Sequence, residues 1–172
     1  WGDAAALLSA LVVTLTPITV ATTRDNLPDA ILVLLMTLGA WGFLNALRTP
    51  RLRPLLVAAV MVGLAFNTKM LQAYLVVPAG VLIYFATSSV PMKRRIGYLL
   101  AAAAVLFAVS GAWMAAVDLT PADQRPYVGG SINNSVLNLV LGYNGLGRVF
   151  GQGGPGAAGG APADGGAAPN GL

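Results

Sequence analysis

Few residues of this 172-residue chain could take part in chemistry, because it contains no His, no Cys and no Glu. Without thiols or imidazoles there is no disulfide framework, no thiol nucleophile, no imidazole base and no zinc site of the usual kind. Acid, base or metal-binding chemistry must therefore fall to the six Asp, and anion binding to the ten Lys and Arg.

Lys69 is the first candidate, because it is the single charged residue between Leu55 and Ser89. An ionisable side chain between apolar helices is costly unless it has a partner or water. A long side chain near a helix end can simply snorkel to the membrane interface. Alternatively, its ammonium group suits a phosphate or pyrophosphate. Gln72, three residues after Lys69, is a second candidate for binding.

A second group of candidates lies in the turn 24–29, where Arg24, Asp25 and Asp29 are close in sequence. A solvated turn at the start of a helix explains these residues. The functional alternative is that Arg24 binds an anion, while Asp25 or Asp29 orients a hydroxyl, a metal ion or Arg24 itself. Sequence position does not separate the two.

Two later stretches, 125–135 and 142–148, mix cations, aromatic residues, glycines and amides. Planar amides and aromatic faces suit a polyol, and Arg or glycine-loop amides suit a phosphate, so a sugar phosphate fits both stretches. Ordinary loops explain them equally well. The candidates here are Arg125, Tyr127, Asn133, Asn134, Tyr143, Asn144 and Arg148.

The composition indicates what must position these residues, since 56% of the chain is hydrophobic and 9% is charged. A soluble domain carries about 25% charged residues. We therefore expect an all-α, polytopic transmembrane helical bundle surrounded by membrane lipids. The net charge of +4 comes from scattered residues that make no basic face, so nucleic acid is not an expected partner.

Apolar run lengths predict five membrane helices, at about 4–23, 27–47, 55–68, 70–89 and 96–117. Residues 118–150 then form an external loop with a short helix near Ser135 to Leu141. The Gly/Ala/Pro-rich stretch 151–172 is expected to be a flexible linker. The chain begins at Trp1 without Met and ends in low-complexity sequence, so we expect a piece of a longer protein.

The cations predict an orientation in the plasma membrane, because short loops rich in Lys and Arg stay in the cytoplasm. The loops 48–53 and 93–95 hold six of the ten cations. Alternation of the helices then places 24–29, Lys69 and 118–172 on the extracytoplasmic side.

Four motifs in order resemble a known family: RDNLPD at 24–29, GLAFNTKMLQ at 63–72, RPYVGGS at 125–131 and GYNGLGR at 142–148. The chain resembles the actinobacterial branch of glycosyltransferase family 39, relatives of protein O-mannosyltransferases and of the aminoarabinose transferase that modifies lipid A. The likeness covers most of residues 1–150. It implies a GT-C fold that moves a mannose-like or aminoarabinose-like sugar from a polyprenyl phosphate to a protein, lipid or glycan outside the cytoplasm.

The resemblance also implies which residues act. Family members carry a catalytic Asp in the first external loop, which we expect upstream of Trp1, so no carboxylate of this chain is put forward in its place. Arg24 with Asp29, and Lys69, match positions that line the donor cavity. Lys69, Arg24 and Arg148 are the cations that would stabilise the departing phosphate. A divalent metal ion is left open as a cofactor, since no residue pattern specifies one.

Two other classes of function stay open. In a secondary transporter or lipid-sugar flippase, Lys69 and the short helices would line a substrate path. A non-catalytic membrane scaffold is the third alternative. An acidic pair in a loop just upstream of Trp1 would favour the enzyme, and an inverted repeat of the helix pairs would favour transport.

Overall fold

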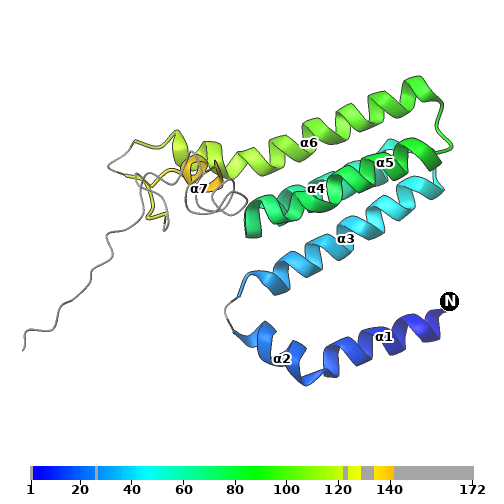
Figure 1. Ribbon diagram of the computed structural model, residues 1–172, viewed down its shortest axis with the longest axis horizontal. Helices are drawn as coiled ribbons and strands as arrows, with labels where there is room; N and C mark the ends of the chain where they lie inside the picture. The colour runs from blue at the N-terminus through cyan, green and yellow to red at the C-terminus, as the bar shows by residue number, and fades with distance from the viewer. Residues whose placement is uncertain (1, 26, 122–123, 129–133, 142–172) are drawn as a thin grey trace, which may run out of the picture. The chain divides into compact units, whose positions relative to one another are not determined.

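Every regular element that the computed structural model describes is a helix (Figure 1). The described residues are 2–25, 27–121, 124–128 and 134–141. The chain divides into two compact units, Trp1–Ala115 and Ala116–Leu172, and each is described by itself. The expected all-α class is confirmed for the described residues.

The first unit begins with two helices, α1 (Asp3–Leu15) and α2 (Pro17–Arg24), whose axes are bent by 60°. The sequence predicts one helix over 4–23, and this prediction is wrong at Thr16 and Pro17, where the helix breaks. Pro17 has no backbone N–H to donate, and its ring clashes with the preceding turn of a continuous helix. Neither helix contains a buried residue.

The next helices, α3 (Asp29–Arg48) and α4 (Leu52–Lys69), pack closely and run antiparallel. Two glycines of α3, Gly39 and Gly42, lie in their contact. A methyl group added to Gly42 would lie 3.1 Å from the backbone nitrogen of Ala58 and 3.2 Å from the backbone oxygen of Pro54. Small residues that let two backbones approach are a common means of association between membrane helices.

After α4 the chain turns through a 3₁₀ helix, η1 (Met70–Val76), into α5 (Val77–Thr87). Tyr84, near the end of α5, packs with Leu55 at the start of α4, so α5 runs back along α4. The second helix expected over 70–89 thus begins with the tighter 3₁₀ winding and becomes α-helical only at Val77.

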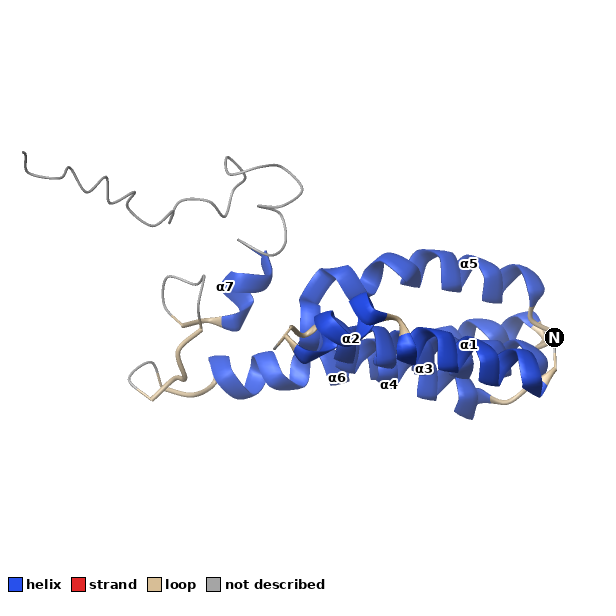
Figure 2. Ribbon diagram, turned by 90° about the horizontal axis from the view of Figure 1, so that it is seen from below, coloured by secondary structure: helices blue, strands red, loops and turns tan. Residues whose placement is uncertain are grey.

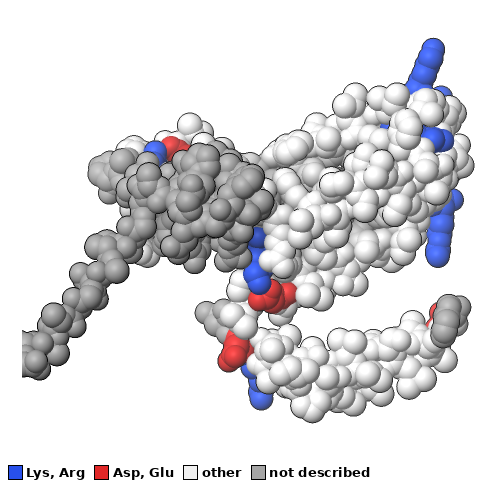
Figure 3. All heavy atoms as spheres, viewed as in Figure 1, with Lys and Arg blue, Asp and Glu red and all other residues white. Residues whose placement is uncertain are grey.

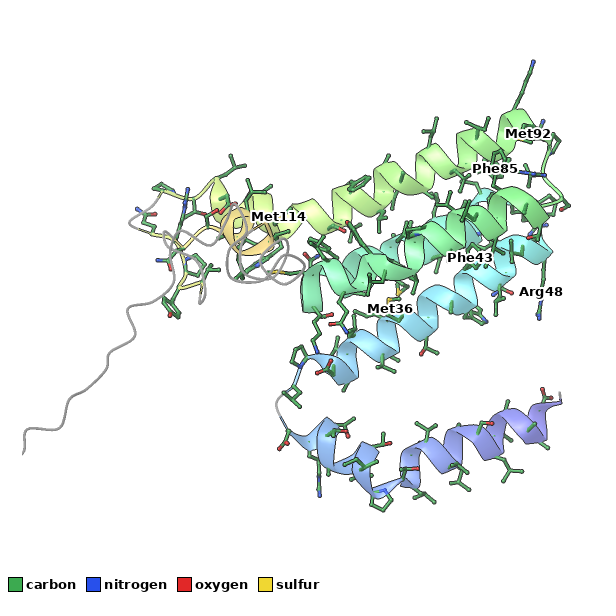
Figure 4. The ribbon with its side chains drawn as sticks, viewed as in Figure 1. Met36, Phe43, Arg48, Phe85, Met92 and Met114 are labelled. Atoms are coloured by element: carbon green, nitrogen blue, oxygen red, sulfur yellow. The ribbon has the colours of Figure 1, made fainter. Side chains whose placement is uncertain are left out.

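The last long helix, α6 (Met92–Asp118), packs against α4 through Gly63, and α5 lies over the layer of α3, α4 and α6 (Figure 2). The ring of Phe43 on α3 lies 6.5 Å from that of Tyr84 on α5, and Figure 4 shows its place on α3. The shared core draws on all four helices: Ala46, Leu55, Ala59, Tyr84, Ala102 and Leu106.

Three helical segments of the described residues are long and apolar enough to cross a membrane: Asp29–Arg48, Leu52–Thr87 and Met92–Asp118. A fourth results if the bent pair α1 and α2 counts as one span. The sequence predicts five, and the counts differ because 52–87 is one apolar segment here. Since α5 doubles back on α4, that segment still supplies two helices to the bundle.

Charged side chains in the first unit gather at the helix ends, and the surface between them carries none on the face shown in Figure 3. Where α3 ends and α6 begins, the cations are Arg48, Arg51, Arg53, Lys93, Arg94 and Arg95. Large apolar side chains are exposed along the helices, such as Leu11, Trp41 and Phe107. This surface suits hydrocarbon rather than water, as expected of a membrane protein.

The second unit contains the last residues of α6 and one further helix, α7 (Val136–Leu141). This helix lies within the stretch 135–141 that the sequence predicts to be helical. The predicted linker, 151–172, lies outside the described residues.

Candidate functional site

Lys69 and Asp29 form an ion pair in the first unit, in which the Nζ of Lys69 donates to Oδ1 of Asp29. Lys69 is the last residue of α4 and Asp29 is the first of α3. Each charge therefore lies at the helix end that its sign favours. The Lys69 side chain is 31% exposed and that of Asp29 is 47% exposed. The Lys69 side chain is thus paired with a carboxylate and still partly exposed.

Local backbone geometry places both charges. Pro28 precedes α3, and its carbonyl accepts the N–H of Leu32 over 3.0 Å, which starts the helix at Asp29. At the other end of the pair, α4 stops because Met70 adopts a φ of 51° and a ψ of −131°. This positive φ lies outside the helical region, so the helix ends directly after Lys69. Residues with a side chain rarely adopt such a φ.

Side chains on both sides of Lys69 are bonded to α6. The amide Nδ2 of Asn67 donates to the backbone oxygen of Val109 over 3.1 Å. The hydroxyl of Tyr74 donates to Oγ of Ser110 over 2.7 Å, and Ser110 is only 2% exposed. The junction between α4 and η1 is therefore attached to two consecutive residues of α6.

Sequence reasoning missed the roles of Tyr74 and Ser110, and it noted Asn67 only as part of the Lys69 motif. A signal for Ser110 was present, because a hydroxyl within an apolar membrane helix often bonds to a neighbouring helix. Tyr74 gave no such signal.

The other candidates of the first unit are exposed. Arg24 ends α2 and Asp25 follows it, and neither side chain makes a hydrogen bond or ion pair with the described residues. The cation that pairs with Asp29 is Lys69 rather than Arg24. Gln72 is exposed on η1.

Arg125, in the second unit, binds the end of α6. Its Nε donates to the backbone oxygen of Thr120 over 2.8 Å, and its Nη2 donates to that of Asp118 over 2.7 Å. The last carbonyls of a helix lack partners within the helix, and Arg125 supplies them. The structure gives Arg125 a role in stabilising this helix end.

Asp118, which the sequence does not single out, joins α6 to α7. Its carboxylate accepts the N–H groups of Val136 and Leu137, each over 3.0 Å, and the hydroxyl of Ser135 over 3.3 Å. These bonds satisfy the first N–H groups of α7 and tie the two helices together within the second unit.

Of the remaining candidates, Tyr127 and Asn134 are among the described residues. Tyr127 is 87% exposed, and Oδ1 of Asn134 accepts the N–H of Val128 over 3.1 Å. Asn133, Tyr143, Asn144 and Arg148 lie outside the described residues. In the described part of the chain, no group of three carboxylate, thiol or imidazole side chains is placed to hold a metal ion.

The fold and its polar helix ends define a polytopic helical membrane protein with a partly exposed lysine paired with a carboxylate. Residues 1–114 match the sequence pattern of dolichyl-phosphate-mannose-protein mannosyltransferases. The chain belongs to this family of GT-C membrane glycosyltransferases, which confirms the resemblance stated above. Its placement in an actinobacterial branch stays a prediction.

Two relatives from Bacillus subtilis (strain 168) are similar to the chain. It is 47% identical over 152 residues to the "Putative mannosyltransferase YycA", a match that covers 88% of this chain and 22% of that protein. It is 45% identical over 159 residues to the "Putative mannosyltransferase YkcB", which covers 92% and 22%. The chain thus spans about a fifth of the length of these relatives. No solved structure matches the chain.

Proposed function

We propose that the whole protein is a membrane glycosyltransferase that moves a sugar from a polyprenyl-phosphate donor to an acceptor on the extracytoplasmic side of the plasma membrane. The sugar would be mannose-like or aminoarabinose-like, and the acceptor a protein, lipid or glycan. Family membership supports the reaction class. The observation that extends the proposal to particular residues is the partly exposed side chain of Lys69, which is paired with Asp29.

The charge on the donor explains why a cation is needed there. In the transfer, the acceptor oxygen bonds to the anomeric carbon of the sugar, and the bond from that carbon to the phosphate oxygen breaks. The polyprenyl phosphate leaves with one more negative charge than it had in the donor. A fixed cation beside that oxygen stabilises the transition state more than the ground state.

Lys69 is suited to stabilising the departing phosphate, because its side chain is already oriented before the substrate binds. Asp29 directs the ammonium, and the exposed fraction of Lys69 leaves room for a phosphate oxygen. Arg24 is exposed and would add a second cation near the donor. The proton of the acceptor hydroxyl must go to a base, for which we assign no residue of this chain.

The proposal is tested by replacing Lys69 with Ala in the full-length protein, with Lys93→Ala as the matched control at the other helix ends. We expect Lys69→Ala to lower kcat for transfer from a synthetic polyprenyl-phosphate mannose by about 100-fold or more, since removing one such donor costs that much in other enzymes. Lys93→Ala should keep the wild-type rate.

Expression and detergent extraction of both variants, followed by chromatography, show whether each is folded. An unchanged rate in folded Lys69→Ala protein would remove Lys69 from the site. If the wild-type protein moves the intact lipid-linked sugar from one leaflet of a vesicle membrane to the other, without cleaving it, the flippase alternative is favoured instead.

A further inference from the structure

The ion pair with Asp29 is too weak to hold Lys69 in place alone. Both side chains are partly exposed, and exposed ion pairs contribute little because solvent screens them and two long side chains must be ordered. Lys69 also borders Met70, whose backbone is in a conformation that side chains disfavour. Something else must therefore set the direction of the chain at this junction.

That support comes from α6, on the two sides of the junction. Asn67 lies before Lys69 and Tyr74 after it, and they bond to Val109 and Ser110. Tyr74 is further fixed between aromatic rings, 4.8 Å from that of Phe66 and 6.2 Å from that of Phe107. These two hydrogen bonds are anchors that attach both the last turn of α4 and the helix η1 to one helix, α6.

The close approach of α4 and α6 makes the first anchor possible. Gly63 and Asn67 are one helical turn apart, so they lie on the same face of α4. A methyl group on Gly63 would lie 2.9 Å from Cβ of Val109, a distance that real Cβ atoms do not show. The missing side chain thus brings α4 near enough for Asn67 to reach the carbonyl of Val109.

We propose that Asn67, Tyr74 and Ser110 are positioning residues for Lys69, which hold its ammonium at the donor phosphate without touching the substrate. This inference rests on the proposed function, because it concerns the geometry of the same site. It gives α6 a part in donor binding, although none of the candidate residues in the first unit lies on that helix.

A double-mutant cycle on the full-length protein tests this role. The measurements are the Kd of a synthetic polyprenyl-phosphate mannose in detergent and the Tm of each variant. We expect Lys69→Met to weaken binding and Tyr74→Phe to raise the Kd by about three- to tenfold. In the Lys69→Met background, Tyr74→Phe should have no further effect on the Kd, because the side chain that it positions is gone.

Three further variants sharpen the result. Ser110→Ala removes the same hydrogen bond from its other partner, and Asn67→Leu removes the second anchor, so either replaces Tyr74→Phe if that variant does not fold. Tyr98→Phe, which removes a tyrosine hydroxyl near the opposite end of α6, should change neither Kd nor Tm. All variants that act through Lys69 should show the same loss of effect in the Lys69→Met background.

The outcomes separate the two proposals. If the wild type does not bind the donor, or Lys69→Met binds it normally, the proposed function of Lys69 fails. If Lys69→Met weakens binding but the anchor variants lower only the Tm, the positioning role alone is wrong. An equal effect of Tyr74→Phe on the Kd in both backgrounds also overturns it, since the residue would then act independently of Lys69.

Discussion

Gly63 shows how a single residue decides the spacing of two helices. Its added methyl group would lie 2.9 Å from Cβ of Val109 and 3.2 Å from the backbone oxygen of Leu106. Neither neighbour is the flexible end of a side chain, so α4 and α6 would have to separate. Gly97, which lies on α6, has open space where a methyl group would be added.

At this scale we expect Gly63→Ala to destabilise the protein by about 1–3 kcal/mol, the usual cost of overpacking. Gly97→Ala is the control, and it should keep or slightly raise stability because Ala favours a helix over Gly. Thermal unfolding of both variants in the same detergent checks the difference. Equal Tm values for the two variants would contradict the close packing of α4 on α6.

At the scale of elements, Arg95 closes the turn between α5 and α6. Its guanidinium donates to the backbone oxygens of Phe85 and Ser88, and it donates to that of Val90 over 2.9 Å from Nη2 and 3.2 Å from Nε. Its Cζ also lies 5.9 Å from the centre of the Phe85 ring. One of the six cations counted for membrane orientation therefore also has a structural role.

Replacing Arg95 by Lys should destabilise the protein nearly as much as replacing it by Ala, by about 2 kcal/mol for the lost charged hydrogen bonds. The three donors of Lys share one nitrogen on a flexible stem, whereas the three carbonyls here are reached from three different nitrogens of the guanidinium. Lys93→Ala, at an exposed neighbour, should have little effect on the Tm. If Arg95→Lys retained wild-type stability, a positive charge alone would be enough to stabilise the turn, and the geometric argument would be wrong.

At the scale of the whole molecule, charge is separated between the ends of the membrane helices. Six cations lie where α3 ends and α6 begins, whereas Lys69 and Asp29 lie at the opposite ends of α4 and α3. Because positively charged loops are retained in the cytoplasm, the loops 48–53 and 93–95 should face inward. The proposed site would then face the extracytoplasmic side, where the family's reaction is expected.

Cysteine labelling tests this orientation, since the chain contributes no Cys of its own. In intact cells, a membrane-impermeant maleimide should label Thr120→Cys in the full-length protein, after any cysteines elsewhere are replaced. Thr49→Cys should react only once the cells are permeabilised. Labelling of both sites in intact cells would overturn the orientation, and labelling of Thr49→Cys alone would reverse it.

The class of protein followed from the sequence itself. Long apolar segments with few charges permit only helices in hydrocarbon, where each backbone group must find its partner inside its own segment. Motif order further predicted the family, which the comparisons confirmed. The break at Pro17 could also have been predicted from the sequence, because its cause is local. The predicted span of 4–23 nevertheless ran through it.

Only the tertiary structure decided which polar groups meet. Asp29 pairs with Lys69, 40 positions along the chain, rather than with the nearby Arg24, because the packing of α3 on α4 brings those two helix ends together. Arg125 looked free to bind a substrate, yet its donors are directed to carbonyls at the end of α6. A hydrogen-bonding group takes the partner that the fold places within reach, and sequence distance does not contain that information.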